Sequence, residues 1–218
     1  TPRIQETENL TIYGNVGNVS IDVNGGSSAK DIAASITSRL SETGVSATAH
    51  TRLNVSFEEE PNGTQKTDTV SFNVYGKNTA PVLISANVDF GETNGRGADL
   101  TDLAAAINGT TGKTGIAASL SVDKSTMTMI SNDGYDIITE DYRLVGVTGP
   151  AMLVAGANED NTSLTGTNSA NVLFDPLTLE PGTDTSSHPN SVHVSGQVTF
   201  RSPFIFSVKS DNIGTSSA

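Results

Sequence analysis

The sequence contains no cysteine and no tryptophan, and aromatic residues make up only 5% of its 218 residues. Without cysteine the chain forms no disulfides and has no reactive thiols, so its composition gives no sign of a redox compartment. So few aromatic side chains disfavour a large stacking groove for sugars or nucleic-acid bases. The chain also has no run of about 18 apolar residues that could span a membrane as a helix.

A signal-peptide pattern is absent too, and the chain opens at Thr1-Pro2-Arg3 without methionine, so we expect a fragment of a longer protein. Its length can hold one large domain or two small ones. Hydrophobic residues make up 35% of the total, while Ser, Thr, Asn and Gly are abundant. This composition favours thin β-rich modules with much solvated surface.

Basic residues are scarce: 12 Lys and Arg face 24 Asp and Glu, which gives a formal net charge of −12. Nucleic acids and anionic membranes would repel such a chain, so we expect neither as a partner. The simplest interpretation is that the acidic surface keeps an exposed protein soluble.

The residues from Ser27 to Val45 predict an amphipathic helix. Ser28 and Asp31 have the spacing of a capping box, Arg39 lies in the last turn, and Gly44 closes the helix. The apolar residues recur on one helical face: Ala29, Ile32, Ala33, Ile36 and Leu40.

The same arrangement occurs a second time. Residues 99–102 repeat the cap, and a strand restarts at residues 116–119. Leu100, Leu103, Ala104 and Ile107 repeat the apolar stripe, and Gly109, Gly112 and Gly115 are predicted to end the helix. Two copies of a capped short helix, a glycine and an alternating strand indicate an internal repeat.

The rest of the chain alternates as strands. Residues 45–58 and 69–75 predict a hairpin through Pro61-Asn62-Gly63, and residues 116–122, 126–131 and 135–140 predict a meander. The predicted fold class is α+β and predominantly β, with antiparallel sheets each packed by one short helix. We expect two β-rich modules, 1–79 and 80–218; the alternatives are that they nest, or that the first and last strands pair.

Residues able to carry chemistry are few and scattered, so we expect no enzyme, no cofactor and no metal site. His188 and His193 lie five apart, which matches no helical zinc spacing, and we expect His50 to be solvated on a strand. The carboxylates between Asp133 and Asp141 lack the calcium-loop pattern, although a weak surface calcium site there is an alternative. Gly91–Gly97 superficially resembles a phosphate cradle, but it lacks the Gly-Lys-Ser/Thr ending.

Three features have surface interpretations. The charge run Glu58-Glu59-Glu60 is expected to guard a sheet edge. Ser163, Thr165 and Thr167 are available for O-linked sugar, although ordinary loop polarity explains them as well. Asn-x-Ser/Thr matches carry little weight in a bacterial protein: Asn18, Asn54, Asn62, Asn108 and Asn161.

The two helix copies resemble the repeated motif in the central regions of bacterial flagellins. The resemblance covers most of residues 20–142 and, weakly, 192–212. Its clearest segments are Ser28–Ala33, Thr43–Ala47, Thr69–Val74, Asp102–Asn108, Thr111–Leu120, Gly134–Ile137, Glu140–Tyr142 and Gly196–Phe200.

This resemblance implies an exported structural protein of the flagellar filament, outward-facing and extracellular, whose partners are neighbouring flagellin subunits. Flagellins polymerise mainly through long terminal helices, and no heptad pattern for such helices occurs here, so we expect the fragment alone to be a monomer. Hook-associated and filament-cap proteins carry related motifs, so they are alternatives within the class. A surface adhesin or carbohydrate-binding module is the alternative of a different class, and an enzyme is the third.

Overall fold

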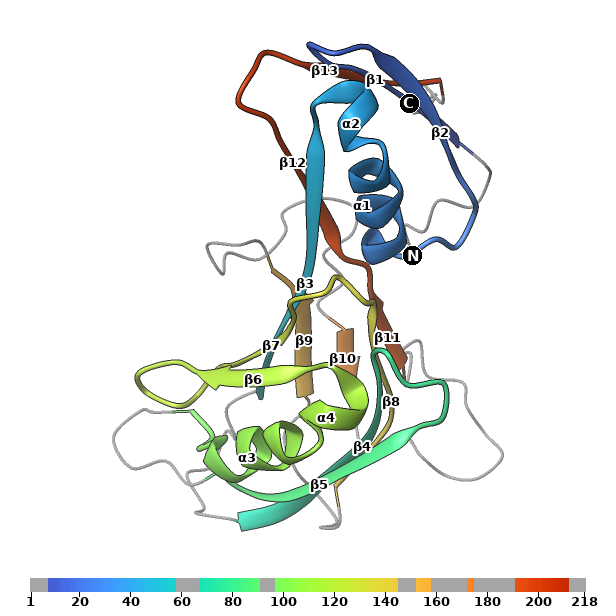
Figure 1. The fold of residues 1–218 in the computed structure, drawn as a ribbon. Helices are drawn as coiled ribbons and strands as arrows, with labels where there is room; N and C mark the ends of the chain where they lie inside the picture. Colours follow the sequence, from blue (N-terminus) through green and yellow to red (C-terminus); the bar gives the residue numbers. More distant parts are fainter. Residues whose placement is uncertain are drawn as a thin grey trace, which may run out of the picture. The chain divides into compact units, whose positions relative to one another are not determined.

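The computed structural model describes residues 8–57, 67–90, 97–144, 152–157, 172–174 and 191–211, mostly as strands in three antiparallel sheets (Figure 1). This confirms the predicted α+β, predominantly β class. The chain divides into two compact units. Unit 1 comprises Thr1–His50, Asp133–Tyr135 and Ser195–Ala218, and unit 2 comprises Thr51–Asn132 and Asp136–Val194.

Unit 1 is a three-stranded sheet, a two-stranded ladder and a broken helix. The sheet has the order β13-β1-β2, β12 pairs antiparallel with the first residues of β3, and α1 packs against β2 and β12. Ile12, Ile36 and Val45 are completely buried in its core. The elements are β1 (Glu8–Tyr13), β2 (Asn18–Val23), α1 (Ala29–Ser38), α2 (Leu40–Thr43), β3 (Ser46–Phe57), β12 (Gln197–Arg201) and β13 (Ser207–Ser210).

Unit 2 contains two larger sheets, of order β11-β8-β4-β5 and β10-β9-β3-β7-β6, and α3 packs against β5 and β6. Phe72, Leu103 and Met129 are completely buried between them. The elements are β4 (Thr67–Tyr75), β5 (Val82–Asp89), α3 (Thr101–Gly109), α4 (Thr111–Thr114), β6 (Ala117–Leu120), β7 (Met127–Ser131), β8 (Ile137–Leu144), β9 (Met152–Gly156), β10 (Val172–Phe174) and β11 (Ser191–Val194).

The first predicted helix is present, and its capping box forms as expected. Ser28 Oγ accepts from the Asp31 amide, and the Asp31 carboxylate accepts from the Ser28 amide. The helix breaks at Arg39, however, and this break turns the Leu40 side chain away from the core. Leu40 is 46% exposed. The prediction that Leu40 packs in the core is therefore wrong; the buried side chain of this turn is Thr43.

The second predicted helix buries all four residues of its apolar stripe. Its cap differs from the prediction, because the helix begins after Leu100 and the Asp99 carboxylate accepts from the Thr101 amide, without a reciprocal capping box. Gly109 is the last residue of α3, which is capped by Thr110, whereas Gly112 lies inside α4 and does not end it. Gly115, with φ of 70°, is the residue that closes the segment.

Two predicted strand pairings are wrong. β3 does not pair with β4: its edges are taken by β12, β7 and β9, and β4 is held between β5 and β8. The meander also fails, because β6 and β7 pair but β8 belongs to the other sheet. Alternation fixes which face of a strand is buried but does not fix its neighbour. The alternative in which the first and last strands pair is confirmed, since β1 pairs with β13.

The contact-defined units and the predicted modules divide the chain differently. The units share β3, whereas the modules 1–79 and 80–218 divide in the turn between β4 and β5. β4 and β5 pair along eight residues, from Thr67↔Asp89 to Val74↔Val82. The split at residues 79 and 80 stays a prediction.

Candidate functional site

The same arrangement of strands and helices occurs in both units, and it extends well beyond the helix and glycine found in the sequence. In unit 1, β1, β2, α1, α2 and β3 follow one another, and β12 and β13 complete the arrangement. In unit 2 the equivalents are β4, β5, α3, α4 and β6, completed by β7 and β8. In both units the last residue of the first strand pairs near the start of the closing strand: Tyr13 pairs with Ser207 on β13, and Tyr75 pairs with Ile138 on β8.

In unit 1, a buried threonine fixes the turn from helix to strand. Thr43 Oγ1 donates to the Arg39 carbonyl at 3.1 Å and accepts from the Val45 amide at 3.1 Å. Gly44 follows with φ of 73°, and its amide donates to the Leu40 carbonyl at 2.7 Å. Because Thr43 is completely buried, its hydroxyl satisfies the Val45 amide in place of water, while the Arg39 carbonyl also accepts from the amides of Glu42 and Thr43.

Unit 2 repeats this turn bond for bond. Thr114 Oγ1 donates to the Thr110 carbonyl at 3.2 Å and accepts from the Ile116 amide at 3.2 Å. Gly115 has φ of 70°, and its amide donates to the Thr111 carbonyl at 2.8 Å. Thr114 and Ile116 are completely buried, as Thr43 and Val45 are in unit 1.

A second glycine in each copy lets the hairpin backbone pass close to this threonine. A Cβ atom on Gly14 would lie 1.7 Å from the Thr43 carbonyl oxygen, and one on Gly76 would lie 2.2 Å from the Thr114 carbonyl oxygen. Only glycine fits such an approach. Sequence reasoning missed these positions, although the dipeptide Tyr-Gly at the end of both first strands was the available signal.

Each helix N-terminus receives a backbone carbonyl from a residue with left-handed geometry. In unit 2 the Leu100 amide donates to the carbonyl of Lys124 (φ 66°) at 3.2 Å, in the turn between β6 and β7. In unit 1 the Lys30 amide donates to the carbonyl of Gly134 (φ 77°) at 3.1 Å. Residues 133–135 therefore take the place of that hairpin turn, which explains why this short segment belongs to unit 1.

The two copies differ in how this hairpin is connected. In unit 2 β6 and β7 are joined directly, with Ala118 opposite Met129. In unit 1 the equivalent pair is β3 and β12, with Ala47 opposite Phe200. The chain leaves unit 1 within β3, after His50, and, apart from Asp133–Tyr135, it builds unit 2 before it returns to unit 1 at Ser195. One copy of the arrangement is thus nested in the hairpin of the other.

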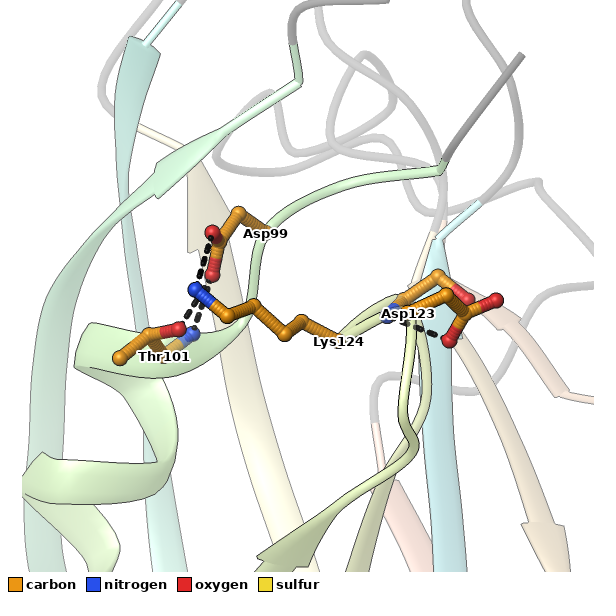
Figure 2. Close-up of polar contacts among 5 residues, drawn as sticks. Asp99, Thr101, Asp123 and Lys124 are labelled. Atoms are coloured by element: carbon orange, nitrogen blue, oxygen red, sulfur yellow. Dashed lines mark hydrogen bonds and ion pairs between the residues drawn. The ribbon is translucent and has the colours of Figure 1, made fainter. Parts of the chain in front are cut away.

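The N-terminus of α3 borders an open polar pocket of about 310 Å³. Hydrogen bonds from Thr101 lower the pKa of Asp99, and Lys124 Nζ, 3.2 Å from the Asp99 carboxylate, lowers it further (Figure 2). The neighbouring turn is held by Asp123, whose pKa is lowered by the hydroxyl of Ser121. These groups cap the helix and pin the turn. The lining residues are Thr67, Asn87, Asp89, Asp99, Thr101, Asp102 and Lys124.

Those of the singled-out histidines and carboxylates that the structure describes do not converge on one centre. His193 Nε2 lies 2.7 Å from Asp136 Oδ2, with side chains 19% and 9% exposed, and His188 lies outside the described residues. His50, expected to be solvated, is half-buried opposite Gln197. Within the described ranges, no group of three His, Cys, Asp or Glu residues could hold a metal ion.

The alternative calcium site between Asp133 and Asp141 does not assemble around one point. Asp136 contacts His193, and Asp141 accepts a hydrogen bond from the Asn73 amide group at 2.9 Å. Glu140 lies beside Tyr75, whose pKa is raised by burial and then by this carboxylate. Each of these carboxylates thus has a different partner.

The other surface candidates fall partly outside the described residues. These comprise Glu58–Glu60, Gly91–Arg96, Asn62, Asn161, Ser163, Thr165 and Thr167. Asn18 is exposed. Asn108 bridges to both backbone groups of Ala118, and Asn54 accepts from the Thr128 hydroxyl at 2.8 Å. Structural hydrogen bonds account for the last two asparagines.

Comparison with known proteins identifies one segment. Residues 9–56 match the family model of the flagellin hook IN motif, while no curated protein matches the chain. In the parts that the structure describes, no helix is long and apolar enough to cross a membrane. The match confirms the flagellin resemblance for the first copy, and the second copy lies outside the matched residues. The segment from β1 through most of β3 is therefore similar to the flagellin hook IN motif.

Proposed function

We propose that this chain is the outward-facing central part of a bacterial flagellin and that its role is structural. Flagellin is a structural family whose subunits assemble with one another in the flagellar filament, and residues 9–56 carry its motif. The observation that carries the proposal is that the residues of this motif are used for packing. Ile12 and Ile36 are completely buried in the core of unit 1, and Thr43, also completely buried, makes the turn described above, so none of them is available to a ligand.

We also propose that unit 2 contains a second motif of the same kind, over residues 67–132 and 136–144. The shared strand order, the threonine turn and the close approach at Gly76 support this assignment. Two such modules thicken the filament, contact neighbouring subunits weakly and present a hydrophilic, extracellular surface that contributes to motility. The net charge of −12 favours solvation of that surface.

The terminal helices through which flagellins polymerise would lie outside these residues. The isolated chain is then a monomer in dilute solution, with neighbouring subunits as its partners and neither nucleic acid nor membrane among them. The runner-up is a domain of a hook-associated or filament-cap protein, since a single motif marks the class rather than one member. An adhesin is a less favoured alternative.

Immunogold electron microscopy of the source cells tests the proposal. Antibodies raised against the purified chain should label flagellar filaments along their whole length. Labelling confined to the filament tip would indicate a cap protein, and labelling at the hook junction would indicate a hook-associated protein. Labelling of the cell body or of other appendages would overturn the filament assignment. Pre-absorption with the purified chain is the control for specificity.

A further inference from the structure

The three-stranded sheet of unit 1 has two uncovered edges, β2 at one end and β13 at the other, among the residues that the structure describes. Exposed strand edges are templates for pairing with another chain. We propose that these two edges are complementary, and that β13 of one copy pairs with β2 of a second copy, so that the sheet continues from subunit to subunit. This inference rests on the proposed function.

Backbone alternation shows which groups each edge offers. The Asp211 amide donates to the Asn9 carbonyl at 3.1 Å, so by alternation Lys209 also bonds β1 and the backbone groups of Val208 point outward. At the turn the Gly14 amide donates to the Gly17 carbonyl at 2.9 Å. By the same alternation, the backbone groups of Asn18, Ser20 and Asp22 point away from β1.

Unit 2 shows that this arrangement accepts a further strand at one of these positions. β8 is the equivalent of β13, and β11 pairs antiparallel with its outer edge through Ser191↔Glu140 to Val194↔Ile137. In unit 1 the described residues place no strand beyond β13. The geometry of the motif therefore permits strand addition at this edge.

The charges on the two edge strands favour a second copy of this chain as the partner. β13 carries Lys209 and no carboxylate, whereas β2 carries Asp22 and no basic residue. Both side chains are exposed, and both lie on the face opposite the core, because Thr11 faces Lys209 and Ser20 while Ile12 faces inward. Pairing β13 with β2 brings opposite charges together, while pairing β13 with another β13 brings two lysines together.

The topology suits a filament. β2 and β13 both run antiparallel to β1, so head-to-tail repetition places them parallel across the junction. A junction of this type joins two different surfaces, so repetition does not stop at a dimer and gives an open helical array wherever the rotation between copies does not close into a ring. The edge is only four residues long, so the contact is weak in dilute solution and forms where other contacts already hold subunits together.

Cross-linking of the purified chain tests this pairing, since the chain has no cysteine of its own. A variant carrying Ser20→Cys and Ser207→Cys is treated at about 1 mM with a thiol linker. The linker should span no more than about 8 Å, because β2 and β13 of one copy are two strands, about 9–10 Å, apart. The expected product is a ladder of dimers, trimers and higher species, while each single-cysteine variant stays monomeric.

Charge variants separate specific pairing from random collision. Lys209→Glu should reduce the ladder about fivefold, because it replaces an attractive cross-strand pair by a repulsive one, and adding Asp22→Lys should restore it. Arg39→Glu, an exposed change on α1–α2 that removes the same positive charge, should leave the ladder unchanged. Ser20→Pro removes an outward amide without breaking a bond to β1, so it should also suppress the ladder while the circular dichroism spectrum stays native.

Three results would overturn the inference: no ladder from a chain that is folded, a ladder insensitive to Lys209→Glu, or dimers from a single-cysteine variant. The two proposals fail separately. Filament labelling without a ladder would leave the proposed function standing and remove the edge pairing. A charge-dependent ladder without filament labelling would do the reverse.

Discussion

Replacing Gly14 by alanine tests the close backbone approach on which the motif is built. The added Cβ would lie 1.7 Å from the Thr43 carbonyl oxygen, well inside any normal contact, so the hairpin or the α2 turn must shift. Because both partners are backbone held by hydrogen bonds, the strain cannot be relieved by a side-chain rotation. Overpacking of this kind costs about 1–3 kcal/mol, and the short distance places Gly14→Ala at about 3 kcal/mol.

Urea denaturation followed by far-ultraviolet circular dichroism measures this loss. With a slope of about 1–3 kcal/mol per M, a loss of about 3 kcal/mol lowers the midpoint by about 1 M or more. Hydrogen exchange then locates the loss, because Gly14→Ala should weaken the amides of unit 1 and Gly76→Ala those of unit 2.

Gly109→Ala is the matched control, since a Cβ there meets nothing within 4 Å and the residue lies in α3. Since Gly109 is the last residue of α3, helix propensity should change the stability of unit 2 by less than about 1 kcal/mol. If Gly14→Ala unfolds at the same urea concentration as the parent chain, the close approach does not exist and the equivalence of the two turns loses its main support.

Three further outcomes are expected. Thr43→Val, which leaves the Val45 amide unsatisfied, should lower the free energy of unfolding by about 1–3 kcal/mol, and Thr43→Ser should recover most of it in urea titrations. Asp99 has a lowered pKa in the folded state, so its contribution to stability is present above its ordinary pKa and lost as pH falls through the folded value. Asp99→Asn should therefore flatten the acid limb of a pH–stability profile. A short peptide inserted after Val122, which is fully exposed in the turn whose unit 1 counterpart holds all of unit 2, should lower the thermal midpoint, because it separates Ser121 from Asp123, but should leave unfolding cooperative; loss of the folded state would contradict the tolerance for insertion that nesting requires.

Periodicity predicted local structure well because burial imposes it directly. The alternation of β3 and of β4 and the stripe of α3 are all present, since a strand or helix with one buried face must repeat its apolar residues. The prediction for Leu40 was wrong because the helix breaks at Arg39. Periodicity assumes one continuous helix, so it assigns residues beyond such a break to the same face as those before it.

Pairing partners could not be predicted from the same pattern. Pro61-Asn62-Gly63 favoured a local hairpin, but β3 finds β7, β9 and β12 instead, far away in sequence. Alternating strands offer equivalent edges to many partners, and the choice depends on which cores can be completed together. Contacts between ionisable side chains could not be predicted either, because their partners lie far apart in the sequence: Asp136 and His193 contact each other across a sequence separation of 57.

The length of β3 follows from nesting. β6, its equivalent, ends at Leu120 where its hairpin turns, whereas β3 continues to Phe57 and pairs within both units. Its buried residues alternate without interruption from Ala47 to Phe57, so each odd-numbered side chain points to a core. Since one inserted residue would reverse every side chain beyond it, the two units constrain the same strand to a single register. The same strand therefore keeps one alternation of side chains in its pairing with β12 in unit 1 and in its pairing with β7 in unit 2.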